Sequence, residues 1–144
     1  MSEKNPLKVH EVAVKYGTSS TDTYQLVSKA QDGISVNAFF DILTISGLSK
    51  EELSGLLDVS FKTIQRYQKE EKKLSALNSE QLLKMIGLYQ KAENIFGTIE
   101  SFNSWLRKPA IGIGGKEPLK FMQTSGGIDL LLEELHRIEY GALA

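Results

Sequence analysis

The sequence predicts an all-α protein, and three observations support this fold class. Apolar residues recur at three- and four-residue intervals in most segments, which is the spacing of a buried helix face. Serine, threonine or asparagine precedes several of these segments and glycine often follows them, as expected where helices begin and end. No segment alternates apolar and polar residues in the manner of a half-buried strand.

Composition narrows the class of protein further. The 144 residues suit one domain or two small domains that share a core, and 41% hydrophobic and 24% charged residues are globular values. Without cysteine there is no disulfide or thiolate zinc site, and no apolar stretch has the length of a signal-peptide core or a membrane span. We therefore expect a soluble cytoplasmic protein with no membrane partner, metal site or cofactor.

The N-terminal segment is rich in helix breakers. Asn5-Pro6 and Gly17 to Ser20 indicate a loose start, with a short helical segment between them. A helix is predicted over residues 23–32, and Gly33 ends it. We interpret residues 1–33 as an N-terminal arm that is either a dimerisation element or a flexible lead.

The next segment carries three predicted helices. The first begins near residue 36 and ends at Gly47. The second follows a capping box, in which the Ser49 side chain accepts from the amide of Glu52 and the Glu52 side chain accepts from the amide of Ser49. Ser60 begins the third. The inward positions of these helices are Val36, Phe39, Phe40, Leu43, Leu53, Leu56, Leu57, Ile64 and Tyr67.

The remainder of the chain also follows a helical pattern. Asn78, with Gln81 three residues later, is predicted to begin the longest helix, which Gly97 ends. A shorter helix begins at Thr98 and is terminated by Pro109, residues 117–124 form one or two turns, and a final helix follows. The inward positions are Leu82, Met85, Ile86, Tyr89, Ala92, Phe96, Phe102, Trp105, Leu106, Ile128, Leu131, Leu132, Leu135 and Ile138.

Residues 49–68 resemble the helix-turn-helix of phage-repressor-type regulators, whose second helix enters the major groove of DNA. Ser54 is small where the two helices cross, Val59 faces the core from the turn, and Asp58 stands where glycine is frequent and tolerates the left-handed conformation. A helical bundle that never contacts DNA can have the same pattern, and that alternative stays open. The predicted DNA-binding residues are Ser60, Lys62, Thr63, Gln65, Arg66 and Lys69.

Charge is distributed unevenly along the chain. Residues 60–75 carry five lysines and arginines against two glutamates, whereas residues 125–144 carry four carboxylates against one arginine. A basic middle and an acidic end can serve two different partners, or they can be two ordinary solvated helix faces.

Short pieces in a fixed order resemble the Xre/MbcA/ParS antitoxins from about residue 33 to the end. In the front half they are residues 33–36, 53–60, 63–66 and 92–97. In the back half they are Trp105-Leu106, Pro109, Gly114-Gly115, Pro118-Leu119, Gly126 and residues 137–141. The family often has asparagine and leucine where this chain has Ala110 and Ile113. On this resemblance, residues 34–97 are an Xre-like helix-turn-helix domain and residues 98–144 a small toxin-binding domain.

The resemblance implies a type II antitoxin that is not an enzyme. It implies a homodimer that binds operator DNA, represses its own operon, and covers a RES-domain toxin that degrades NAD. A pocket that holds NAD phosphates tends to be lined by basic residues, so an acidic last helix suits it. The predicted toxin-binding residues are Glu133, Glu134, Arg137, Glu139, Tyr140, Leu143 and Ala144.

Other interpretations were weighed against this one. The chain could be a stand-alone transcriptional regulator without a toxin, or an adaptor that neutralises a toxin without contacting DNA. Residues 112–117 lack the first glycine and the final serine or threonine of a phosphate-binding loop. Trp105 fits the core better than an exposed contact, and His10 and His136 lack metal-ligand companions at useful spacing. No residue constellation supports catalysis.

Overall fold

The computed structural model describes residues 8–19 and 22–141. Within these ranges the chain is helical, with two isolated β-bridges and no strand, as predicted. The α-helices are α1 (Val9–Lys15), α2 (Thr23–Asp32), α3 (Asn37–Ser46), α4 (Lys50–Leu57), α5 (Phe61–Lys69), α6 (Ala76–Phe96), α7 (Ile99–Leu106) and α8 (Ser125–Gly141). Two short 3-10 helices, η1 (Ile111–Ile113) and η2 (Pro118–Gln123), connect α7 to α8.

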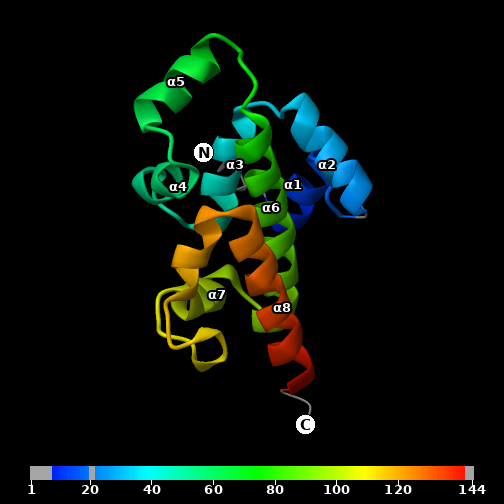
Figure 1. Ribbon diagram of the computed structural model, residues 1–144, viewed down its shortest axis with the longest axis vertical. Helices are drawn as coiled ribbons and strands as arrows, with labels where there is room; N and C mark the ends of the chain where they lie inside the picture. The colour runs from blue at the N-terminus through cyan, green and yellow to red at the C-terminus, as the bar shows by residue number, and fades with distance from the viewer. Residues whose placement is uncertain (1–7, 20–21, 142–144) are drawn as a thin grey trace, which may run out of the picture.

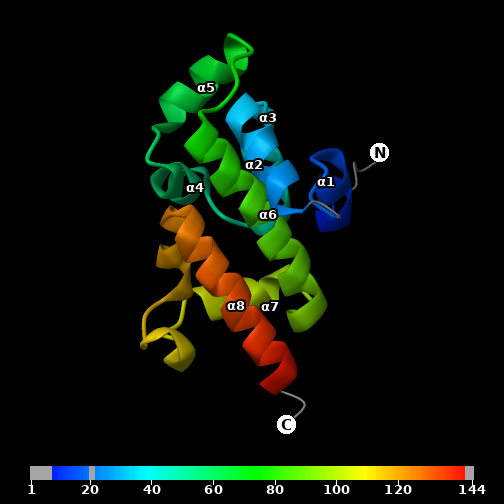
Figure 2. The same cartoon turned by 45° about the vertical axis from the view of Figure 1, so that its right-hand side comes forward.

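Helix α6 is the central element of the molecule. Helices α2 and α8 pack along it, and α1, α3 and α7 also contact it (Figures 1 and 2). Helix α5 stands at one end of the molecule, and the C-terminal end of α8 lies at the other (Figures 1 and 2). One buried apolar cluster includes side chains from α1 and from α3 to α8. The two halves of the chain, before and after the C-terminal end of α6, therefore share a core.

Helix α1 belongs to this core. Val9, Val12 and Ala13 are buried, and Asp41 on α3 accepts hydrogen bonds from Lys15 at 2.8 Å and from the Tyr16 hydroxyl at 2.5 Å. The short helical segment predicted between the breakers is therefore present as α1, but it packs into the core and is not loose. The sequence pattern is too short there to distinguish an apolar turn that packs from one that does not.

Most helix starts are those that the sequence predicted. Ser49 and Glu52 form the capping box of α4, with both hydrogen bonds at 3.0 Å, and Ser60 and Thr98 cap α5 and α7. The start of α6 is an exception, because Ser75 and not Asn78 is its cap. Asn78 lies inside the helix and donates its side-chain amide to the carbonyl of Leu57 at 3.0 Å.

Helix α8 begins where the chain turns sharply after η2. Thr124 Oγ1 accepts from the amide of Gly127 at 2.9 Å. A Cβ at residue 127 would overlap the carbonyl of Phe121, so this close approach of η2 to α8 requires glycine.

The described residues contain neither a membrane-spanning helix nor a metal-binding cluster. No helix among them is long and apolar enough to cross a membrane. No cluster of three or more His, Asp or Glu side chains in residues 8–19 and 22–141 could hold a metal ion.

Candidate functional site

The turn between α4 and α5 has the geometry of a helix-turn-helix. Asp58 adopts the left-handed conformation, with φ 55° and ψ 40°, as the sequence suggested. The amide of Val59 donates to the carbonyl of Ser54 at 3.2 Å, which closes the turn after α4. Ser54 is buried, and this small side chain leaves room for the tight turn.

Helix α5 is attached to the body by one side. Ile64 is its only fully buried residue, with 0% exposure, and Phe61 and Tyr67 are half-buried beside it. The Phe61 ring lies 6.0 Å from that of Phe39 and 6.2 Å from that of Phe40, centroid to centroid. These contacts fix which face of α5 points outward.

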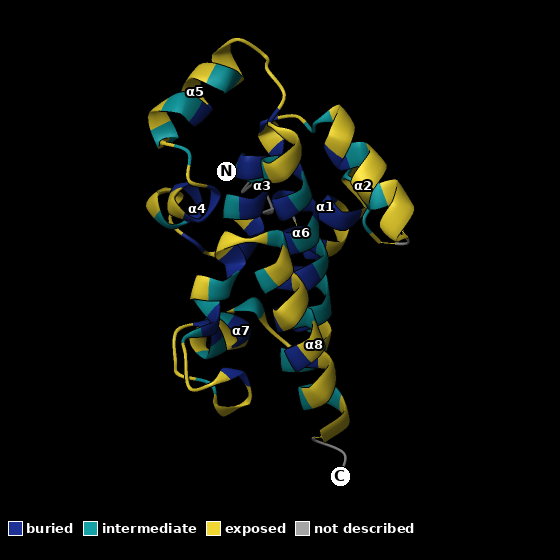
Figure 3. Ribbon diagram, viewed as in Figure 1, coloured by how far each residue is buried: buried dark blue, intermediate teal, exposed yellow. Residues whose placement is uncertain are grey.

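The outward face of α5 is polar and basic. Most of α5 is coloured as exposed or intermediate in Figure 3, and Lys62, Gln65, Arg66, Gln68 and Lys69 are exposed. Ser60 and Thr63 have a second task, because the Ser60 hydroxyl accepts from the amide of Thr63 at 3.1 Å and lies 2.9 Å from the Thr63 hydroxyl. The side chains that line a shallow hollow on this face are Lys62, Gln65, Arg66, Gln68 and Lys69.

The acidic residues of α8 have partners within the chain. Asp129 pairs with Lys84 at 2.7 Å and Glu139 with Lys91 at 2.9 Å, both lysines being on α6. Glu134 is only 7% exposed and pairs with Arg137 one turn later. Glu133 is exposed and takes part in no ion pair among the described residues. The helix is therefore less available as an acidic surface than its sequence suggested.

Burial of Glu134 differs from the expectation that this residue faces a partner. Its carboxylate lies directly over Gly112, where a Cβ would overlap it, and Arg137 donates to the Gly112 carbonyl at 2.9 Å. Arg137 itself has 63% of its side chain exposed, and Tyr140 is 69% exposed. Leu143 and Ala144, which the sequence also assigned to this surface, lie outside the described residues.

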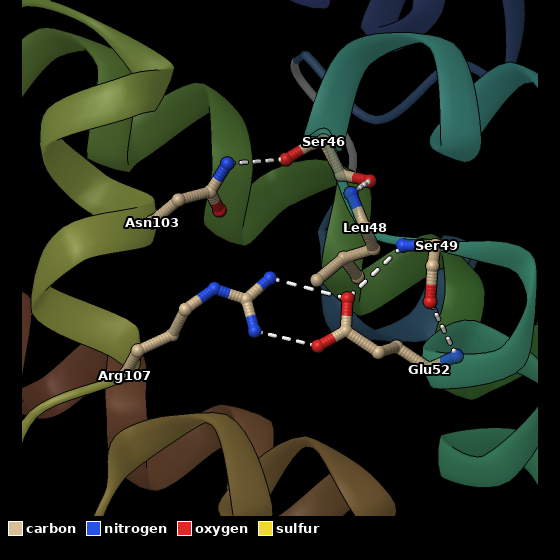
Figure 4. A network of polar contacts seen from close by, with 6 residues as sticks. All are labelled: Ser46, Leu48, Ser49, Glu52, Asn103 and Arg107. Atoms are coloured by element: carbon tan, nitrogen blue, oxygen red, sulfur yellow. Dashed lines mark hydrogen bonds and ion pairs between the residues drawn. The ribbon is translucent and has the colours of Figure 1, made fainter.

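A polar network joins the two halves of the molecule (Figure 4). The guanidinium of Arg107, at the end of α7, donates to both carboxylate oxygens of Glu52 at 2.5 and 3.1 Å. These hydrogen bonds, and that from the Ser49 amide, hold the pKa of Glu52 below its ordinary value. In the same region Asn103 donates to the carbonyl of Ser46 at 2.6 Å.

A second polar contact between the halves is buried. The Gln81 side chain of α6 donates to the carbonyl of Leu56 at 2.7 Å and to that of Met122 at 2.9 Å. Sequence reasoning assigned Gln81 to a helix start and did not find this role. Neither this contact nor the Glu52–Arg107 pair has a local sequence signal, because the partners are far apart in the chain.

Comparisons with known proteins match two successive parts of the chain to two family models. Residues 25–87 match the model of the antitoxin Xre-like helix-turn-helix domain. Residues 91–141 match the model of the antitoxin Xre/MbcA/ParS C-terminal toxin-binding domain. A search of curated proteins found no match. The border between the two matched regions falls inside α6.

Proposed function

Because the chain belongs to the Xre/MbcA/ParS antitoxin family, we propose that it neutralises a RES-domain toxin that degrades NAD and represses its own operon. The observation that carries this proposal is the pairing of two matched domains with two separate surfaces. The outward face of α5 lies at one end of the molecule, and the exposed end of α8 lies at the other (Figures 1 and 2). One protein can then hold DNA and toxin at the same time in the cytoplasm.

On the DNA side, α5 would enter the major groove. Gln65 and Arg66 have the side chains that pair bidentately with adenine and guanine, and Lys62 and Lys69 would contact phosphates. Ser60 caps the helix by accepting from the Thr63 amide, and the two hydroxyl groups lie within hydrogen-bond distance, so both residues would fix the first turn of α5 beside a phosphate. A homodimer would place two such helices on the half-sites of a palindromic operator.

On the toxin side, neutralisation would be steric. Among the predicted toxin-binding residues, those that are exposed on α8 are Glu133, Arg137 and Tyr140. Leu143 and Ala144 remain part of the proposed contact through the sequence alone. Glu139 and Glu134 would contribute indirectly, because their ion pairs hold Lys91 and Arg137 in place. The chain itself would perform no chemistry and would need no cofactor.

The toxin half of the proposal is tested by co-expression with the product of the adjacent gene. We expect the two proteins to co-purify, and the partner alone to consume NAD in a reaction that this chain suppresses. A partner without NAD-degrading activity would contradict the RES assignment. Absence of any complex would favour a stand-alone regulator.

The DNA half is tested by gel shift on the region upstream of the gene. The double variant Gln65→Ala/Arg66→Ala is expected to bind about 100-fold more weakly, because each bidentate base contact contributes roughly 1–3 kcal/mol. The matched control, Lys120→Ala/Gln123→Ala, removes exposed side chains of the same kinds from η2 and should bind DNA normally. Equal affinity of both double variants would remove α5 from the DNA interface. Light scattering on the wild-type protein tests the homodimer.

A further inference from the structure

One apolar side chain extends into solvent from the toxin-binding domain. Ile111, in the loop between α7 and α8, is 95% exposed, the largest value among the exposed large hydrophobic residues that the structure describes. An isolated exposed apolar residue needs no explanation, but this one is held in place by an unusually well-bonded loop.

The loop is closed on itself by backbone hydrogen bonds. The amide of Ala110 donates to the carbonyl of Lys116 at 3.0 Å, and the amide of Gly115 donates to the carbonyl of Ala110 at 2.9 Å. Ile113, two residues after Ile111, is buried in the core cluster and anchors the loop from beneath. These contacts constrain the main chain that carries Ile111.

Helix α8 holds the same loop from the side. Arg137 donates to the Gly112 carbonyl at 2.9 Å, and the buried Glu134 carboxylate lies against Gly112 and pairs with Arg137. A Cβ at residue 112 would displace the Glu134 carboxylate from this position. Glu134 and Arg137, which the sequence predicted as direct toxin contacts, thus hold Gly112, the residue next to Ile111.

The loop adjoins an exposed face of α8. Leu130, Glu133, Arg137 and Tyr140 follow one another at helical spacing, and all four are exposed. Arg137 connects this face to the loop through Gly112. Arginine and tyrosine are enriched among the residues that dominate binding energy at protein interfaces. The whole surface lies within the region that matches the toxin-binding domain.

We propose that Ile111 is the apolar anchor of the toxin interface, inserted into a small apolar pocket on the toxin surface, with Arg137 and Tyr140 beside it. Glu134 is a positioning residue that fixes the loop. This inference rests on the proposed function. It adds a contact outside the acidic helix. The hydrogen bonds of the loop would reduce the conformational entropy that is lost when Ile111 is inserted into the toxin.

The test uses the full chain and the purified toxin, with affinity measured by calorimetry. Ile111→Ser is expected to weaken toxin binding at least about 10-fold, as truncation of an interface anchor does. Leu77→Ser is the matched control, since Leu77 is 81% exposed but lies at the start of α6, in the helix-turn-helix region. It should bind the toxin as the wild type does. Ile111→Leu should restore most of the affinity that serine loses.

A double-mutant cycle tests the positioning role of Glu134. Glu134→Gln should weaken binding, and Ile111→Ser should then have a smaller additional effect than in the wild type, because the loop is no longer fixed. Strictly additive effects would show that Glu134 does not act through Ile111.

The outcomes distinguish this inference from the function on which it rests. If the wild type binds no RES toxin, both fail. If the wild type binds and Ile111→Ser binds equally well, only the anchor is wrong. If Ile111→Ser changes the homodimer and leaves toxin affinity unchanged, the loop is a contact between copies of this chain, and the inference is overturned.

Discussion

Helices α5 and α8 both carry a concentration of charge in the sequence, but the fold uses the two sets of charges differently. Helix α5 is joined to the body by Ile64 and its half-buried neighbours, and its outward basic side chains enter no ion pair among the described residues. Helix α8 lies along α6 and buries Ile128, Leu131, Glu134 and Leu135. Three of its four carboxylates are paired within the chain.

The difference follows from how each helix is attached. A helix held by a single buried residue leaves most of its circumference in solvent, so its charges stay available to a partner such as DNA. A helix that lies against a longer one brings its flanking charges near those of its neighbour, and intramolecular pairs form. Net charge in a sequence window therefore indicates a binding surface only when the attachment of the helix is also known.

The largest expected effect comes from the buried anchor of α5. Ile64→Ala should lower the free energy of unfolding by about 2–5 kcal/mol, because it leaves a cavity where a fully buried side chain was. Since nothing else on α5 is fully buried, DNA binding should be lost as the helix loses its position. Urea denaturation and a gel shift measure the two effects.

Leu131→Ala is the matched change on α8, because Leu131 is also 0% exposed. It should destabilise the protein by a similar amount and reduce toxin binding more than DNA binding. If Ile64→Ala abolished toxin binding as completely as DNA binding, at a temperature where both variants are folded, α5 and α8 would not serve separate surfaces.

A smaller effect is expected at the pair that joins the halves. Arg107→Gln should lower stability at pH 7 by about 1 kcal/mol or less, since the pair is bidentate but a third or more of each side chain is exposed. Glu52 has a lowered pKa in the folded protein, so its contribution is present above its ordinary value of 4.5 and is lost as the pH falls through the lowered value.

The difference in stability between wild type and Arg107→Gln should accordingly shrink as the pH falls below about 4.5. Arg107→Lys keeps the charge but not the fork of donors, and it should recover only part of the loss. A difference that stays constant from pH 7 to pH 3 would mean that Arg107 stabilises the protein through packing and not through Glu52.

The smallest expected effect concerns Tyr89, beneath this pair. Its side chain is fully buried, and among the described residues its hydroxyl makes no hydrogen bond of normal geometry, with Ser46 as the candidate partner. Tyr89→Phe removes a buried polar atom and keeps the ring, which stacks edge-on against Phe102 at 5.2 Å. Thermal unfolding should show unchanged or slightly raised stability, by up to about 1 kcal/mol. A clear loss of stability would mean that the hydroxyl forms a hydrogen bond with Ser46.

Local features of this fold could be predicted from the sequence. The caps at Ser49, Ser60 and Thr98 depend only on residues within one turn, and so does the left-handed Asp58. Contacts between distant residues could not. Glu52 and Arg107 meet because α3 and η2 each pack against both α4 and α7, and no local pattern encodes that geometry.

The exposure of the candidate binding residues could likewise be predicted from the sequence only where a helical pattern is present. The outward residues of α5 could be predicted because the inward ones, Ile64 and Tyr67, fix the helix phase. Burial of Glu134 had a signal that was not used, since it lies three residues after Leu131 and four before Ile138, at the edge of the apolar stripe. The exposure of Ile111 had none, because a glycine-rich loop gives no periodicity from which to predict orientation.

The border between the two matched regions falls within α6, where Leu88 and Tyr89 are fully buried, and it contains no linker. Helix α6 cannot be opened at one end without disturbing the core that the other end shares, so we expect both halves to unfold in a single cooperative transition. A cellular protease that engages an unfolded segment of either half would then eliminate both halves in one event. Release of the operon and release of the toxin would be simultaneous consequences of the same cleavage.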